Sequence, residues 1–234
     1  MTTAERYFNF LETQYVDEDG SRRQPAPSLF VQHLREVHAE QTPRFDIGAC
    51  LAGTQSNFTG RVWCCSDLHF FHTNIIKYCE RPFATAEEMN NTLLKNCLAC
   101  VGPDDILLIG GDITMSNLDG TNALLRAIPG YKINVLGNHD THKHQRLKLA
   151  VDETVACLEF NYQGGSIFVS HYPVSESVLA PGEVNLHGHI HNNALPPALG
   201  NGSRHINMCV ELTQYSPSLL KALLSEKLSL RSFK

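Results

Sequence analysis

The sequence predicts one large α/β domain preceded by a helical extension. Five short apolar runs recur from Arg61 onward, each followed directly by polar residues; they span 62–65, 106–109, 133–136, 167–169 and 184–186. Short apolar runs that end in turn residues are typical of strands buried on both faces. Helical spacing of apolar residues over 86–100 and 117–127 separates the first three runs, and this alternation predicts an α/β sheet.

The first 60 residues have a different character. Apolar residues recur at helical spacing over 4–16 and 28–40, and a polar break containing Pro25 separates the two segments. Residues 41–60 are rich in small and polar residues, which predicts a loop or linker. We therefore expect 1–60 to be a helical extension packed on a main domain that spans 61–234.

Composition restricts the partners and the compartment. The chain has 234 residues and a formal net charge of −5, which argues against binding to extended duplex nucleic acid. No apolar stretch approaches the length that crosses a membrane, so no membrane partner is expected. The eight cysteines lack the regular spacing of a secreted disulfide scaffold, and the first ten residues lack the apolar core of a signal peptide. These features favour a cytoplasmic protein, and nothing in the sequence predicts its oligomeric state.

The polar residues after the five apolar runs are of metal-binding types. Ligands of α/β sheets gather outside the carboxyl ends of the strands, so the five clusters are expected at one edge of the sheet. In Asp67-x-His69 and His189-x-His191 the spacing of two is the period of a strand, which predicts that both side chains point the same way. The clusters contain Asp67, His69, Asp112, Asn138, His139, Asp140, His171, His189 and His191.

These residue types point to a particular chemistry. Carboxylates beside imidazoles suit Mn, Fe, Zn or Ni better than calcium. Two glycines before Asp112 allow a tight turn that brings its carboxylate close to an ion. The amide oxygen of Asn138 can bind a metal, His139 can stand near the reacting centre, and Asp140 can orient it from behind. Each histidine taken singly is as well explained by surface decoration, but five clusters at five strand ends together predict a metal site.

The motifs Asp67-x-His69, Gly111-Asp112, Gly137-Asn138-His139-Asp140, His171 and Gly188-His189-x-His191, in this order, resemble those of the calcineurin-like metallophosphoesterase superfamily over about residues 61–215. The resemblance implies a four-layer α-β-β-α sandwich. It also implies two divalent metal ions, one on Asp67, His69 and His191, the other on Asn138, His171 and His189. Asp112 would bridge the ions, and His139 would be the catalytic histidine.

Two further segments are similar to a small bacterial and phage subgroup of phosphoesterases predicted from sequence. These are 66–78 with Arg81-Pro82-Phe83, and 206–212 followed by Tyr215 and Pro217. The arginine-bearing motif that follows Gly-Asp in serine/threonine phosphatases is absent after Asp112. A phosphoprotein substrate is therefore not expected.

Together, the motifs and the resemblance predict a phosphoesterase that hydrolyses a phosphodiester or phosphomonoester of a small or nucleotide-like molecule. Two ions, manganese being the first expectation, would lower the pKa of a bridging water so that hydroxide attacks phosphorus. His139 would donate a proton to the leaving alkoxide. Substrate contacts are assigned to His72, Arg81 and His142, although each is equally well explained by a surface or supporting role. Two alternatives stay open: a nuclease on single-stranded nucleic acid, and a metal-bound scaffold without catalysis.

Overall fold

Two β-sheets form the centre of the molecule in this computed structural model, which describes residues 27–39, 41, 43–140 and 148–229. The expected helix over 4–16 and the candidate residue His142 lie outside these ranges. The first sheet has the strand order β4-β3-β2-β1-β9, and only β9 runs antiparallel to its neighbour. Its strands are β1 (Val62–Cys65), β2 (Ile106–Ile109), β3 (Tyr131–Val135), β4 (Glu153–Val155) and β9 (Ser218–Leu219).

The second sheet has the order β5-β6-β7-β8. The pair β5 and β6 is antiparallel, whereas β6, β7 and β8 are parallel. Its strands are β5 (Leu158–Tyr162), β6 (Gly165–Val169), β7 (Val184–His187) and β8 (His205–Asn207). The sequence predicted one sheet edge for all five polar clusters. Instead the first three clusters follow β1, β2 and β3, and the last two follow β6 and β7 of the other sheet.

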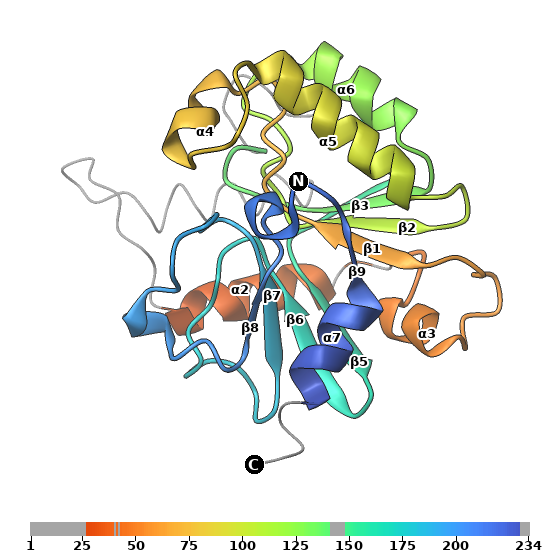
Figure 1. Cartoon of the computed structure of the whole chain (residues 1–234). Coiled ribbons are helices and arrows are strands. Elements are labelled where there is room, and N and C mark those ends of the chain that lie inside the picture. Colours follow the sequence, from red (N-terminus) through yellow and green to blue (C-terminus); the bar gives the residue numbers. More distant parts are fainter. Residues whose placement is uncertain (1–26, 40, 42, 141–147, 230–234) are drawn as a thin grey trace.

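Helices cover the outer faces of both sheets (Figure 1). Helices α5 and α6 pack on the outer face of the first sheet through Met89, Leu93 and Leu125. Helix α2 packs on the outer face of the second sheet, where Leu34 belongs to the same apolar cluster as Phe168. The helices are α2 (Pro27–Ala39), α3 (Ile47–Ala52), α4 (Thr73–Tyr78), α5 (Ala86–Cys100), α6 (Leu118–Ala127) and α7 (Leu220–Ser229), with 3₁₀ turns η1 (Pro197–Leu199) and η2 (Val210–Thr213).

The main hydrophobic core lies between the two sheets and stabilises the four-layer arrangement. Alternate residues of β1 and β2, such as Cys64 and Leu108, face Ile167 and Leu186 of the second sheet. All four side chains are at most 1% exposed. Burial of apolar area on this scale is the dominant favourable term in folding. The α-β-β-α sandwich that the resemblance implied is therefore confirmed.

Residues 41–60 are not simply the loop that their composition predicted, because they contain α3. Asp46 precedes the helix, and its side chain accepts a hydrogen bond from the Ala49 backbone N–H at 3.1 Å. Gly53 ends the helix in a left-handed conformation with φ of 74°, which glycine adopts without a Cβ clash. Ile47 and Leu51 are buried in the core between the sheets. The predicted helix over 28–40 is confirmed as α2.

No helix among the described residues is long and apolar enough to cross a membrane.

Candidate metal centre

The segment after β1 turns through left-handed backbone rather than continuing as a strand. Asp67 and His69 have φ of 58° and 51°, conformations that Asp and His adopt more readily than most residues. The Asp67 N–H donates to the Gly111 carbonyl and the His69 N–H donates to the Asp112 carbonyl, both at 3.0 Å. The prediction that strand pleating aligns the two side chains is therefore wrong, because two left-handed turns tied to the segment after β2 place them. His189 and His191, with φ of 70° and 51°, follow β7 in the same way.

The carboxylate of Asp67 is held so that one oxygen is engaged and the other is not. Its Oδ2 accepts hydrogen bonds from Ser66 Oγ at 2.5 Å, His189 N at 2.9 Å and Cys209 Sγ at 3.2 Å. Its Oδ1 is buried without a hydrogen-bond partner, and His69 Nε2 is in the same state. Buried polar atoms without partners are rare in native proteins and point to a ligand such as an ion.

These two atoms face each other across a small space. His69 Nε2 lies 3.8 Å from Asp67 Oδ1, and His191 Nε2 lies 3.7 Å from the same oxygen. His69 Nε2 is also 3.6 Å from Asp112 Oδ2. Asp67, His69 and Asp112 offer ligand atoms that all lie within 4.8 Å of one another. The structure thus brings together the residues assigned to the first ion.

Asp112 occupies the middle of the site. Its Oδ1 accepts a hydrogen bond from the His139 backbone N–H at 2.8 Å. Its Oδ2 lies 3.4 Å from His171 Nε2, 3.6 Å from His69 Nε2 and 3.9 Å from His139 Nε2. A single buried carboxylate oxygen therefore faces imidazoles from both groups of candidate ligands.

A second group of candidate ligands meets Asp112 from the other side. Asp112, His171 and His189 offer ligand atoms within 4.8 Å of one another. His171 Nδ1 is 2.7 Å from the Gly110 carbonyl, and this contact leaves Nε2 directed at the site. His171 Nε2 lies 3.0 Å from Asn138 Oδ1. A backbone carbonyl on the far nitrogen is the usual support of a metal-binding histidine.

Two glycines allow the strand ends to approach this closely. A Cβ on Gly111, whose φ is 93°, would lie 2.6 Å from the backbone nitrogen of Gly137 and 2.7 Å from His171 Nδ1. A Cβ on Gly188 would lie 2.0 Å from Ser66 Oγ and 2.3 Å from Asp67 Oδ2. All four separations are shorter than real contacts of a Cβ, so a side chain at either position would push candidate ligands apart.

Asp140, which the sequence predicted behind the ring of His139, contacts backbone groups of the loops after β2 and β3. Its buried carboxylate accepts hydrogen bonds from the backbone N–H groups of Asp112, Ile113 and Gly137, each at 3.0 Å. A further bond comes from Asn134 Nδ2 at 3.1 Å. Asp140 thus fixes the loops after β2 and β3 relative to each other. Burial and the nearby Asp112 raise its pKa, although these hydrogen bonds oppose the shift.

The electrostatics of the site favour bound positive charge. Burial alone would raise the pKa of Asp112, but the facing His171 outweighs it and lowers the value to about 2. Burial likewise opposes ionisation of Asp67, yet imidazoles of the site hold its pKa well below the ordinary value. Burial would lower the pKa of His171, but the two carboxylates raise it to about 9. The buried, ionised carboxylates favour protonation of the neighbouring imidazoles. Divalent cations can take the place of these protons.

The three residues that were expected to contact the substrate differ in where they lie. His72 is half-buried beside the site, with Nδ1 3.4 Å from His69 Nδ1, and burial lowers its pKa to about 4. Arg81 is only 4% exposed, and its guanidinium bonds Glu211, Met89 Sδ and the carbonyls of Asp67 and Leu68. It therefore supports the site from within, because it has no free surface to offer a substrate. His142 lies outside the described residues.

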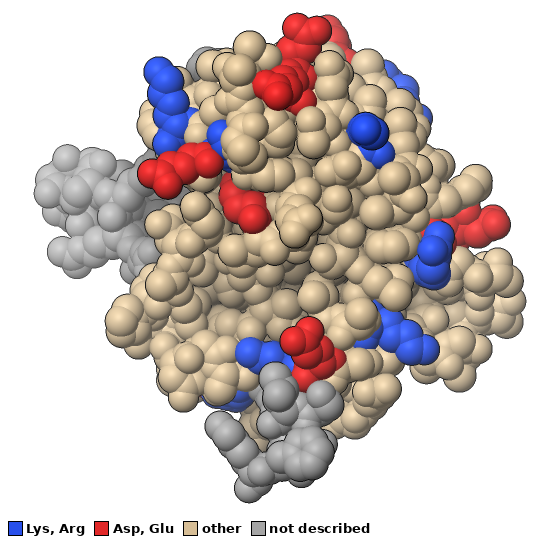
Figure 2. Space-filling model, in the orientation of Figure 1, with Lys and Arg blue, Asp and Glu red and all other residues tan. Residues whose placement is uncertain are grey.

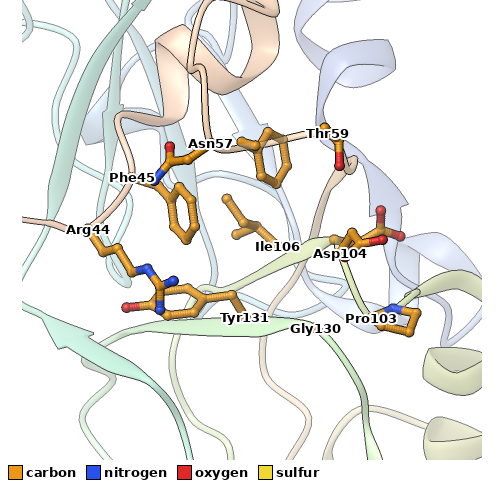
Figure 3. Close-up of a pocket in the computed structure, with 11 residues that line it drawn as sticks. Arg44, Phe45, Asn57, Thr59, Pro103, Asp104, Ile106, Gly130 and Tyr131 are labelled. Carbon is orange, nitrogen blue, oxygen red and sulfur yellow. The ribbon is translucent and has the colours of Figure 1, made fainter.

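A surface hollow of about 330 Å³ lies elsewhere on the molecule. Ile106 begins β2 and Gly130 directly precedes β3, so this hollow lies at the ends of the strands opposite to the metal site. Arg44 covers the rings of Phe45 and Tyr131 there, at 5.2 Å from each ring centre (Figure 3). None of the candidate ligands lines it.

Sequence reasoning also left out three residues that support the site: Ser66 and Cys209 on Asp67, and Glu211 on His191. The only available signal was the similarity of 66–78 and 206–212 to the subgroup. All eight cysteines are free thiols.

The comparisons with known proteins agree with this geometry. The calcineurin-like phosphoesterase family matches residues 60–208. The uncharacterized protein MJ1445 of Methanocaldococcus jannaschii is 35% identical over 161 residues, which are 67% of this chain and 85% of the relative. The chain therefore belongs to the calcineurin-like phosphoesterase family, whose members bind divalent metals and act on phosphate esters.

One solved structure supports the same fold. The crystal structure of AQ665 from Aquifex aeolicus, a protein of unknown function, matches with a TM-score of 0.59 and 28% identity. The match covers 71% of this chain and 99% of AQ665. The nuclease MPE of Pseudomonas putida matches with a TM-score of 0.37 and 19% identity, over 56% of this chain and 62% of the nuclease. That second likeness is too low to bear on function.

Proposed function

We propose that the protein hydrolyses a phosphodiester or phosphomonoester of a small or nucleotide-like molecule with two divalent metal ions. The observation that carries this proposal is the position of Asp112 Oδ2, within 3.4–3.9 Å of imidazole nitrogens of His171, His69 and His139. A carboxylate oxygen shared in this way suits a bridge between two ions, and paired ions are typical of phosphoester hydrolysis.

The donor set fits the ions without further groups. Asp67, His69 and His191 would hold one ion, and Asn138, His171 and His189 the other, with Asp112 between them. Mixed carboxylate, amide and imidazole donors suit manganese, with iron, zinc and nickel as alternatives. Such ions supply hydroxide at neutral pH and neutralise phosphate charge. The buried, unpartnered Asp67 Oδ1 and His69 Nε2 support this assignment.

His139 is the proposed proton donor to the leaving group. Its side chain is 29% exposed, so it can reach a substrate, and its Nε2 lies 3.9 Å from Asp112 Oδ2. Burial lowers its pKa, although the charge on Asp112 opposes the shift. His72, beside His69, is the proposed contact for the substrate.

The charge distribution favours a small substrate over a polymer. Lys and Arg side chains are scattered singly over the face seen in Figure 2 and do not gather into a patch. The net charge is −5, and Arg81 is buried in an ion pair. A groove that tracks single-stranded nucleic acid combines basic side chains with aromatic platforms. The nuclease reading is therefore the second candidate, and a non-catalytic scaffold the third.

The test is a substrate screen on the full chain reconstituted with Mn²⁺, with elemental analysis of the same sample. Phosphomonoesters, linear diesters, cyclic nucleotides, single-stranded DNA and single-stranded RNA form the panel. We expect two ions per chain and turnover of at least one small ester. Asp112→Asn should lose both metal and activity, whereas the exposed Asp104→Asn is the matched control and should keep both.

Other results would redirect the assignment. Cleavage of the nucleic acids without turnover of small esters would establish the nuclease alternative. Two bound ions with no turnover across the panel would favour the scaffold. A wild-type chain that binds fewer than two ions after reconstitution would contradict the dinuclear site.

A further inference from the structure

The segment from Asn207, the last residue of β8, to Glu211 touches the metal site at three points. Asn207 Nδ2 donates to the carbonyl of His191 at 2.8 Å, and Asn207 Oδ1 accepts from the Cys209 N–H at 3.0 Å. Cys209 Sγ donates to Asp67 Oδ2 at 3.2 Å. Glu211 Oε1 lies 2.8 Å from His191 Nδ1. Alternate residues of one short segment thus contact two candidate ligands of the first ion.

Glu211 is held in place by a buried arginine. Its Oε1 accepts from Arg81 Nε at 2.9 Å and from Arg81 Nη2 at 2.6 Å. The side chains of Arg81 and Glu211 are 0% and 2% exposed. The same guanidinium donates to the carbonyl of Asp67 at 2.7 Å and to that of Leu68 at 3.0 Å. Arg81 therefore links Glu211 to the backbone of the turn that carries Asp67 and His69.

This arrangement has a direct consequence for His191. With Nδ1 donating to Glu211, the proton of the neutral ring is on Nδ1 and the lone pair is on Nε2. That Nε2 lies 3.7 Å from Asp67 Oδ1, the oxygen that has no hydrogen-bond partner. A carboxylate behind a histidine fixes the tautomer and the orientation of the ring and makes the ligand more basic.

We propose that Glu211 and Arg81 are positioning residues for the first metal ion, acting through His191. The proposal rests on the proposed function, because it assigns a support to one of the two ion sites. A purely structural ion pair is the competing explanation. Removing a buried charge destabilises a protein in either case, so stability does not separate the two explanations. Metal affinity does.

The experiment is a calorimetric titration of the metal-free full chain with Mn²⁺, for wild type, Glu211→Gln and Glu211→Ala. Glutamine keeps an oxygen acceptor for Nδ1 but lacks the charge, whereas alanine removes the contact. Loss of such a partner weakens metal affinity about 10- to 100-fold. We expect one of the two binding steps to weaken by that factor in Glu211→Ala and by less in Glu211→Gln, while the other step stays at the wild-type affinity.

Glu183→Gln is the matched control. Glu183 is a second buried glutamate, with a side chain 3% exposed, and it pairs with Arg35 away from the metal site. It should alter the melting temperature without changing either Mn²⁺ affinity. Arg81→Lys provides a second test that keeps the positive charge but cannot bond Glu211 and both carbonyls together. It should weaken the same step as Glu211→Gln.

Failure of this proposal is distinguishable from failure of the proposed function. Wild type that binds two ions, beside folded Glu211 and Arg81 variants with unchanged affinities, would overturn the positioning role alone. Equal weakening of both steps would also overturn it, because the contact would then act on the fold in general. Wild type that binds no metal would instead overturn the proposed function on which the inference rests.

Discussion

Candidate ligands in this site are held by strained backbone rather than by regular strands. Five of them have φ between 51° and 70°: Asp67, His69, Asp112, His189 and His191. Such conformations are of order 1–3 kcal/mol less favourable each, and they persist where the surroundings over-determine them. Here the surroundings are hydrogen bonds between the loops, such as those that the Asp140 carboxylate accepts from backbone N–H groups after β2 and β3. These turns place the candidate ligand atoms close to one another.

His139 offers a prediction that separates proton donation from metal binding. His139→Ala should lower kcat by about 10²- to 10⁴-fold, the usual contribution of a general acid, and should leave two ions bound. The loss should be smaller for a nitrophenyl ester than for an alkyl ester, because nitrophenolate leaves without a proton. Steady-state kinetics on the two esters and metal analysis check both points. An equal loss on both esters would remove His139 from the role of acid.

Asp105 gives a prediction of stability against pH, away from the metal site. Burial alone would raise its pKa, but hydrogen bonds from Gly102, Arg61 and Trp63 outweigh burial and lower it. The folded pKa therefore lies below the unfolded value of about 3.9. The stabilisation is present above the unfolded pKa and is lost as pH falls through the folded pKa.

Asp105→Asn should accordingly destabilise the protein at pH 7 more than at pH 3. Urea unfolding of both proteins across this range measures the gap, which should narrow as the pH falls through the window just below 4. The exposed neighbour Asp104→Asn is the control and should show no such change. A gap that does not vary with pH would show that the hydrogen bonds act equally on both charge states.

At the scale of helices and strands, sequence patterns predicted the bounds of some elements and missed other elements for physical reasons. Continuous apolar runs predicted β1 and β2 at their observed bounds, and helical spacing did the same for α5. Strand β5 was missed because only alternate residues are buried, so it lacks a continuous apolar run. Helix α3 was missed because its six residues are too few to show a helical period. Left-handed turns at Asp67 and His69 were missed because spacing alone does not reveal dihedral angles.

Helix α2 gives a prediction at this scale. Leu34 is 0% exposed and packs in one cluster with Phe168 and Cys157 on the outer face of the second sheet. Leu34→Ala should destabilise the protein by about 2–5 kcal/mol, as expected for a leucine removed from a core. Urea unfolding measures the change. Exposed Glu36→Ala on the same helix should stay within about 0.5 kcal/mol of wild type. An equal, small effect of both would show that α2 contributes little to stability.

For the molecule as a whole, the metal site lies where the two sheets meet. Asp67, His69, Asp112 and Asn138 follow strands of the first sheet, whereas His171, His189 and His191 follow strands of the second. The sequence assigned these residues through the family resemblance, and the structure brings them together. The sequence could not reveal the role of Arg81, because an arginine near a motif looks the same in a sequence whether its side chain faces solvent or pairs with Glu211. The contacts of Cys209 and Glu211 with candidate ligands could not be predicted either, since their partners are distant in sequence.

Because the ligands come from both sheets, bound ions should hold the sheets together. An ion that binds only the folded state stabilises it by about 2.7 kcal/mol when free metal is at 100 times its Kd. We therefore expect Mn²⁺ to raise the melting temperature of the metal-free protein, and a chelator to reverse the effect. Asp112→Asn should lose this increment.

Hydrogen exchange locates the effect. Amides of β1, β2 and β3 in one sheet and of β6 and β7 in the other should exchange more slowly with Mn²⁺ bound, since opening the interface between the sheets would break metal bonds. Amides of α2 should change less, because this helix packs on the outer face of the second sheet and not at the site. Protection confined to one sheet would mean that the ions bind ligands from that sheet alone, which would contradict a bridge through Asp112 between the two groups of ligands.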